Sequence, residues 1–173
     1  MEYTGRVESA AIRGDVKLSV EDTGIIIAAL FDVYHISYAD ISSFELQNYA
    51  VRILTEKDAF TVRGLGNACD AFLTELYAAY NKKVRKALFV RGTPLFETRG
   101  EYRYDEGDGA LQGRAFIEVY ESCVLILPPD DGGRRIPLCF LHAMEESDFT
   151  LTLKLDTGES YSFLRQAHAG GTL

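Results

Sequence analysis

The sequence predicts a mainly β fold with one long helix, built as two consecutive antiparallel units of which the first ends in that helix. Three observations support this prediction. Short apolar stretches alternate with turn residues at hairpin spacing, one segment has helical periodicity, and the two halves match at an offset of about 100 residues. Short strands at this spacing are typical of an antiparallel sheet bent into a half-open barrel or sandwich.

Alternating apolar residues indicate where the strands lie. Turn-forming residues separate them, as in Glu21–Gly24 and Pro128–Gly133. The predicted strands centre on residues 16–20, 25–27, 34–38, 51–53, 60–62, 102–104, 116–120, 124–127, 151–155 and 161–163.

The helical segment covers residues 67–88. We expect Asn67 to cap its N-terminus, with Asp70 near the positive end of the helix dipole. Basic residues fall in the last turns, where the carbonyl end of the dipole favours them. Its apolar face is formed by Phe72, Leu73, Leu76, Tyr77, Tyr80, Val84 and Leu88. Its basic end is formed by Lys82, Lys83, Arg85 and Lys86.

The two halves of the chain repeat each other. Val16–Val20 aligns with Ala115–Val119, and hydrophobic class is kept at further positions along the chain. The matching pairs are Ile36 with Ile136, Tyr38 with Leu138, Ile41 with Leu141, Phe44 with Met144, Val51 with Leu151, Ile53 with Leu153, Phe60 with Tyr161, and Val62 with Phe163. We interpret this as an internal duplication, with units at residues 1–90 and 91–173.

Six or seven strands closed by a C-terminal helix resemble the pleckstrin-homology (PH) superfold. The segment Tyr38–Leu46, followed by a hairpin, Gly64–Gly66 and the apolar-faced helix, is similar to bacterial PH-like domains. In architecture, two such units in tandem also resemble the paired PH domains of histone-chaperone subunits. The resemblance implies a fold that often serves binding.

The second unit departs from this pattern at its end. After Phe163 the chain runs through residues 164–173, which include two glycines and a threonine, poor helix formers. We expect this unit to lack its helix, either because it is cut short after Leu173 or because its open end is covered from elsewhere. Unit one, a second copy or another helix could cover the apolar surface left there.

Composition and charge narrow the classes of partner. The chain has 173 residues, and 47% of them are apolar, a fraction that excludes a disordered chain at this net charge. The net charge of -8 argues against sequence-independent nucleic-acid binding. Residues 1–90 carry -2 and residues 91–173 carry -6, so a charged partner of the second unit should be basic.

Anionic membrane surfaces are disfavoured as partners. In the first hairpin loop Arg13 and Lys17 are offset by Glu8 and Asp15, and the corresponding stretch 104–110 is acidic. Arg134 and Arg135 form the basic pair outside the helix, which we interpret as salt-bridge partners at the start of a strand.

No arrangement of residues predicts catalysis, a cofactor or a metal. His35 fits a sheet-face histidine and His168 lies in the C-terminal tail, while Cys139 and His142, even with Cys123, lack the two close pairs of a zinc site. Paired acids fall in turns or at strand ends, where solvated charge is the simple explanation. They are Asp105–Glu106, Asp108, Asp130–Asp131 and Glu145–Glu146.

Cys69, Cys123 and Cys139 are widely spaced and odd in number, so we expect buried thiols in a reducing cytoplasm. The N-terminus does not read as a signal peptide, and no apolar run is long enough to span a membrane.

The sequence thus favours a non-enzymatic module that binds a protein or peptide at a sheet edge or open barrel end, with binding residues unassigned. The alternatives are a phosphoinositide or anionic membrane-surface binder and, less favoured, an enzyme with an unrecognised site. Association of copies through the uncapped second unit is a further expectation.

Overall fold

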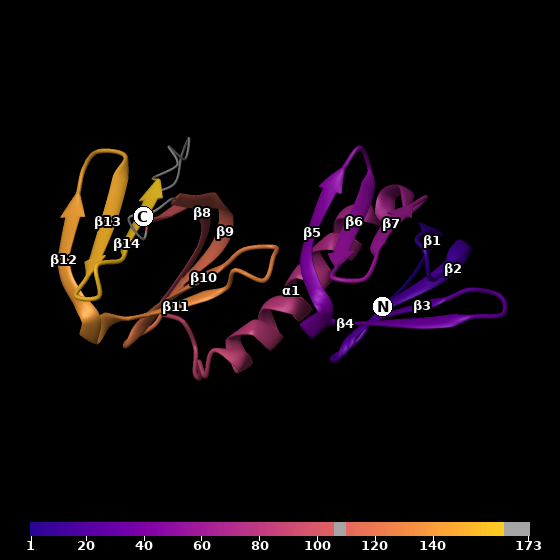
Figure 1. The fold of residues 1–173 in the computed structure, drawn as a ribbon, viewed down its shortest axis with the longest axis horizontal. Helices are drawn as coiled ribbons and strands as arrows, with labels where there is room; N and C mark the ends of the chain where they lie inside the picture. The colour runs from indigo at the N-terminus through magenta and orange to yellow at the C-terminus, as the bar shows by residue number, and fades with distance from the viewer. Residues whose placement is uncertain (106–109, 165–173) are drawn as a thin grey trace. The chain divides into compact units, whose positions relative to one another are not determined.

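The computed structural model describes residues 1–105 and 110–164 and has the predicted mainly β class (Figure 1). It divides into unit 1, Met1–Arg91 with Pro129–Asp131, and unit 2, Gly92–Pro128 with Gly132–Leu173. In the described residues, no helix has the length and apolar character needed to cross a membrane.

Unit 1 is a seven-stranded antiparallel sheet followed by a helix. The strand order is β4-β3-β2-β1-β7-β6-β5, which leaves β4 and β5 as its edges. Its elements are β1 (Glu2–Glu8), β2 (Arg13–Val20), β3 (Gly24–Ala28), β4 (Val33–Ser37), η1 (Tyr38–Asp40), β5 (Ile41–Gln47), β6 (Ala50–Thr55), β7 (Ala59–Arg63), η2 (Gly66–Ala68) and α1 (Cys69–Ala87).

Unit 2 is a second seven-stranded antiparallel sheet with the same order, β11-β10-β9-β8-β14-β13-β12. Its edges are therefore β11 and β12. Its elements are β8 (Phe96–Asp105), β9 (Ala110–Val119), β10 (Cys123–Leu127), β11 (Arg134–Pro137), η3 (Leu138–Phe140), β12 (Leu141–Glu146), β13 (Thr150–Leu155) and β14 (Ser160–Leu164).

The two sheets also agree in register, as an internal duplication requires. Phe44 pairs with Ile53, and Met144 pairs with Leu153. Each unit has a β-bulge two to three residues before that pair, between 41 and 43 in β5 and between 141 and 143 in β12. The predicted strands omit β1, β5, β11 and β12, and the predicted range 34–38 is too long. Tyr38 belongs to the short 3-10 turn η1, as Leu138 belongs to η3, because the chain turns there between the fourth and fifth strands.

The long helix lies where the sequence predicts it, but it begins differently. The N-cap position is Ala68, whose backbone is already helical, and no side chain caps the helix. Asn67 lies within η2, so the predicted Asn67 cap is wrong: the 3-10 turn leads straight into α1. Asp70 in the first turn and Arg85 and Lys86 in the last match the predicted charge pattern.

The helix completes the core of unit 1. The ring of Phe44 in β5 packs edge-on against Tyr77 and Tyr80, with both centroid distances 5.3 Å. At the N-terminal end, Tyr3 packs edge-on against Phe72 at 5.1 Å. Burial of this apolar face is what holds α1 in place.

The core of unit 2 is formed between its own strands. Tyr104 and Tyr161 pack with ring centroids 4.8 Å apart, and the guanidinium of Arg134 lies 4.1 Å from the Tyr104 ring centre. No ion pair of Arg134 occurs among the described residues, so its predicted salt-bridge role is replaced by a cation–π contact. The cluster contains Tyr102, Tyr104, Ala115, Ile117, Val124, Ile126, Ile136, Leu153, Leu155, Tyr161 and Phe163.

Candidate protein-binding surface

Unit 2 has an exposed apolar surface at the positions that α1 covers in unit 1. Phe44 is 1% exposed beneath the helix, whereas the matching Met144 is 64% exposed. By strand register, Tyr3 and Tyr38 correspond to Thr98 and Leu138. We call the matching set in unit 2 the open face. It consists of Thr98, Leu138, Met144 and Leu151, which are half-buried apart from the exposed Met144.

The expectation that unit 2 lacks a C-terminal helix concerns residues 165–173, which lie outside the described residues. The expected exposure of apolar surface is found at Met144 and also at Phe149, 68% exposed in the turn after β12. Large exposed apolar side chains grouped on one part of a domain are typical of binding surfaces.

The strands that carry Met144 and Leu151 of the open face belong to an acidic segment. The segment 141–164, which forms β12 to β14, carries five carboxylates and one lysine. That lysine, Lys154, pairs with Glu145 at 2.8 Å, and His142 Nδ1 lies 3.2 Å from Asp156. Both pairs are well exposed, so they contribute little to stability but leave the surroundings negative. The open face therefore suits an apolar partner with basic flanks.

A second apolar surface lies at the turn between β3 and β4. Leu30, Phe31 and Val33 are 86%, 92% and 73% exposed. The turn is closed by a 2.7 Å hydrogen bond from the Ala29 N–H to the Asp32 carbonyl. Sequence reasoning missed this tip. The available signal was a turn of Ala-Leu-Phe-Asp where polar residues are the rule.

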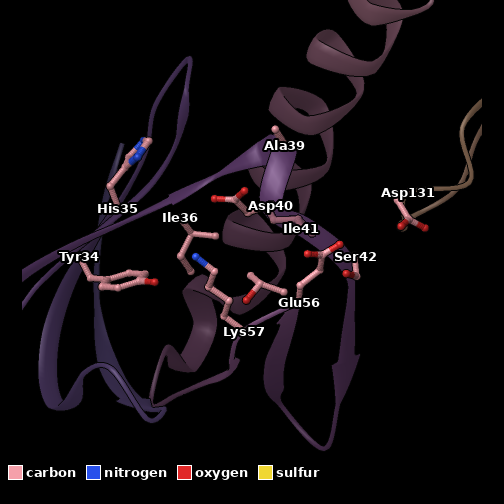
Figure 2. A pocket seen from close by; sticks show the side chains of 11 residues that line it. Tyr34, His35, Ile36, Ala39, Asp40, Ile41, Ser42, Glu56, Lys57 and Asp131 are labelled. Atoms are coloured by element: carbon pink, nitrogen blue, oxygen red, sulfur yellow. The ribbon is translucent and has the colours of Figure 1, made fainter.

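Unit 1 has a polar cavity of about 260 Å³ between β4, η1 and the β6–β7 turn (Figure 2). Lys57 lies at this cavity near the carboxylates of Asp40 and Glu56, and Asp131 also lines it. The histidine in its lining, His35, is in β4 as predicted, with Nε2 3.2 Å from the Thr23 hydroxyl. The lining consists of Tyr34, His35, Ile36, Ala39, Asp40, Ile41, Ser42, Thr55, Glu56, Lys57 and Asp131.

The first hairpin loop, which would hold phosphates in a phosphoinositide-binding PH domain, already holds a carboxylate. Asp58 accepts hydrogen bonds from the N–H groups of Ala10 at 3.1 Å, Ala11 at 3.0 Å and Ala59 at 2.8 Å. Burial raises the pKa of Asp58, but these backbone bonds and Ser9 outweigh it, so the pKa is lowered. An incoming phosphate would have to displace this carboxylate.

The cysteines and histidines are not brought together. Cys69 and Cys123 are buried as predicted, but Cys139 is exposed, because it lies in η3 rather than in a strand. His142 faces Asp156 instead of a thiol. Over residues 1–105 and 110–164, no three His, Cys, Asp or Glu side chains are grouped as metal ligands.

The paired acids are dispersed in the same way. Asp105 ends β8, while Glu106 and Asp108 lie outside the described residues. Glu145 and Glu146 end β12, and the Asp130–Asp131 pair belongs to unit 1.

The fold and these surfaces define a class, a tandem of two seven-stranded antiparallel β units with exposed apolar surface. No known protein family and no curated protein matches the chain. Among solved structures, the Spt16D Pob3N heterodimer matches with 10% sequence identity and a TM-score of 0.35, over 90% of this chain and 83% of that one. This is a distant likeness of fold.

Proposed function

We propose that the chain is a non-enzymatic protein-binding module of two PH-like units. The open face of unit 2 is its principal site, and an amphipathic helix of a protein partner is its ligand. One observation carries the proposal. The same sheet position is 1% exposed at Phe44, where a helix covers it, and 64% exposed at Met144. Helix-in-groove binding uses this type of surface.

The chemistry of the partner follows from α1. Its buried face presents Phe72, Leu76 and Tyr77 at helical spacing, and its last turn carries Arg85 and Lys86. A partner helix with the same apolar spacing and basic end would complement both the open face and the negative charge of unit 2.

A peptide with the sequence of α1, Cys69–Ala87 with Cys69 replaced by serine, is a defined probe for this site. We expect saturable binding of the fluorescently labelled peptide to the full chain, measured by anisotropy. Met144→Asp should weaken binding at least about tenfold, because a charge placed on an apolar contact costs more than 1.4 kcal/mol. A control peptide with Leu76 and Tyr77 changed to serine should not bind.

Leu111→Asp supplies the matched protein control, since Leu111 is an exposed leucine, at 58%, in strand β9 of the same unit. It should leave binding unchanged. Absence of binding by the α1 peptide, or equal losses from the two aspartate variants, would contradict the proposed site.

Phosphoinositide binding has less support than protein binding. Asp58 occupies the N–H groups of the first hairpin loop, and unit 2 is strongly acidic. Both features oppose an anionic ligand.

A further inference from the structure

One point on the outer edge of β5 is already paired within unit 1, by the segment Pro129–Asp131. The Phe44 N–H donates to the Pro129 carbonyl at 2.9 Å, and the Asp131 N–H donates to the Ser42 carbonyl at 3.0 Å. These two bonds form an antiparallel bridge at Ser43. Three residues therefore suffice to satisfy the outward N–H of Phe44 and the outward carbonyl of Ser42.

Among the described residues, no segment is paired with the matching outer edge of β12. Because β12 has the register and bulge of β5, the Met144 N–H and the His142 carbonyl point outward, as those of Phe44 and Ser42 do. Within the described part of the chain, neither group has a hydrogen-bond partner. A strand edge with free N–H and C=O groups is a template for a further strand.

We propose that the outer edge of β12 binds an extended, basic segment of a protein partner, which adds to the sheet as an antiparallel strand. This inference rests on the proposed protein-binding function. It adds the outer edge of β12 to the open face as a second part of the binding site. The geometry is the one seen at β5, with the incoming segment accepting from the Met144 N–H and donating to the His142 carbonyl. Main-chain bonds supply affinity in this mode, and side chains supply selectivity.

Charge selects a basic segment and opposes a second copy of this chain. The strands β12 to β14 and their turns carry five carboxylates against one lysine. Two such edges brought together would repel each other, whereas lysine or arginine on the incoming strand would be attracted.

The other edge of unit 2 is less suited to this role. Strand β11 has only four residues and ends in Pro137, which has no N–H to donate. It also begins with Arg134 and Arg135, which oppose a basic segment. A short strand with proline and arginine is a protected edge, so β12 is the edge that remains open to pairing.

The test uses a labelled ten-residue peptide of alternating valine and lysine, titrated into the full chain by anisotropy. We expect saturable binding and protection of the Met144 amide from hydrogen exchange. N-methylation of the peptide amides that face β12 should weaken binding at least about tenfold, because it removes the main-chain hydrogen bonds that hold the added strand. N-methylation of the alternate amides should have little effect, and a valine–glutamate peptide should not bind.

Two variants of the protein test the same hydrogen bonds by changing β12 instead of the peptide. Met144→Pro and Met144→Thr both remove the methionine side chain, but only proline removes the outward N–H. We expect the proline variant alone to lose binding of the valine–lysine peptide, with circular dichroism and thermal unfolding confirming that both variants are folded.

Equal binding of the two N-methylated peptides would overturn the proposal even if Met144→Pro failed to fold. A dimer in sedimentation that Met144→Pro abolishes and Met144→Thr retains would assign the edge to a second copy and overturn it as well. If the unaltered chain does not bind the valine–lysine peptide but does bind the α1 peptide, the proposed edge is refuted and the proposed function stands.

Discussion

Units 1 and 2 have the same strand order, the same bulge and the same 3-10 turn, yet their matching apolar faces differ in what covers them. In unit 1 the helix buries Phe44 to 1% exposure, and in unit 2 Met144 is 64% exposed. The backbone of this fold therefore does not determine whether the face is part of the core. Coverage of the face does, and in unit 1 the helix α1 provides it.

The substitutions between the units agree with this difference. Tyr3, Tyr38 and Phe44 surround the helix of unit 1 and make its aromatic contacts. Their counterparts Thr98 and Met144 are smaller or more flexible. An unbranched methionine adapts to differently shaped partners, as expected of a surface that binds rather than one that packs permanently.

The largest expected contrast comes from truncating the matched pair. Phe44→Ala should lower the free energy of unfolding by about 3–5 kcal/mol, because it leaves a cavity under Tyr77 and Tyr80. Met144→Ala should change it by no more than about 0.5 kcal/mol. Urea unfolding of the two variants measures both values, and similar losses would show that the open face is buried in solution.

Asp58 should have the next largest effect. Asp58→Ala leaves the N–H groups of Ala10, Ala11 and Ala59 without their acceptor, so we expect a loss of about 1–3 kcal/mol at pH 7. Because the folded-state pKa of Asp58 is lowered, its stabilisation is present above the unfolded value of about 3.9 and is lost as pH falls through the folded value.

Urea midpoints measured between pH 7 and pH 2.5 check the Asp58 prediction. The wild type should lose more stability than Asp58→Asn over the acid part of this range. Parallel curves for the two proteins would show that the carboxylate contributes no charge-dependent stability.

A gain of stability is expected at the helix. Asn81 is 3% exposed, and its side-chain oxygen is buried without a hydrogen-bond partner. Asn81→Leu removes this unsatisfied acceptor and should raise the free energy of unfolding by about 1 kcal/mol. Asn81→Asp serves as the control, because an added buried charge should lower the thermal midpoint. A lower midpoint for the leucine variant would mean that the amide makes an essential contact.

Much of this fold could be predicted from the sequence because its signals are periodic. Alternation located ten of the fourteen strands of the described residues, helical spacing located α1, and the matched pairs indicated the duplication. The wrong predictions concern local details, a helix cap and the burial of a cysteine, that depend on the adjoining 3-10 turns. Asn67 does not cap because η2 continues into the helix, and Cys139 is exposed because η3 turns it outward.

The candidate site was less predictable for a physical reason. The sequence predicted exposed apolar surface in unit 2 from the poor helix formers after Phe163, and Met144 is 64% exposed there. It did not predict which residues form that surface, because a partner-binding face uses the same apolar residues as a core. The free edge of β12 depends on backbone groups, which carry no sequence signal. The acidic character of the second unit predicted the charge of the proposed partner, a basic one.

The smallest expected effect concerns the hairpin turns that precede β6 and β13. In unit 1, Asn48 and Tyr49 both have positive φ, 50° and 61°, as a two-residue turn of the I′ type requires. Glycine adopts this conformation without strain, so Tyr49→Gly should stabilise the chain by about 0.5–1 kcal/mol despite its greater freedom when unfolded. In unit 2 the turn residue Phe149 has no positive φ, and Phe149→Gly should bring no gain. Thermal unfolding of the two glycine variants tests this, and an equal gain in both would attribute the effect to loss of an exposed aromatic ring rather than to the backbone.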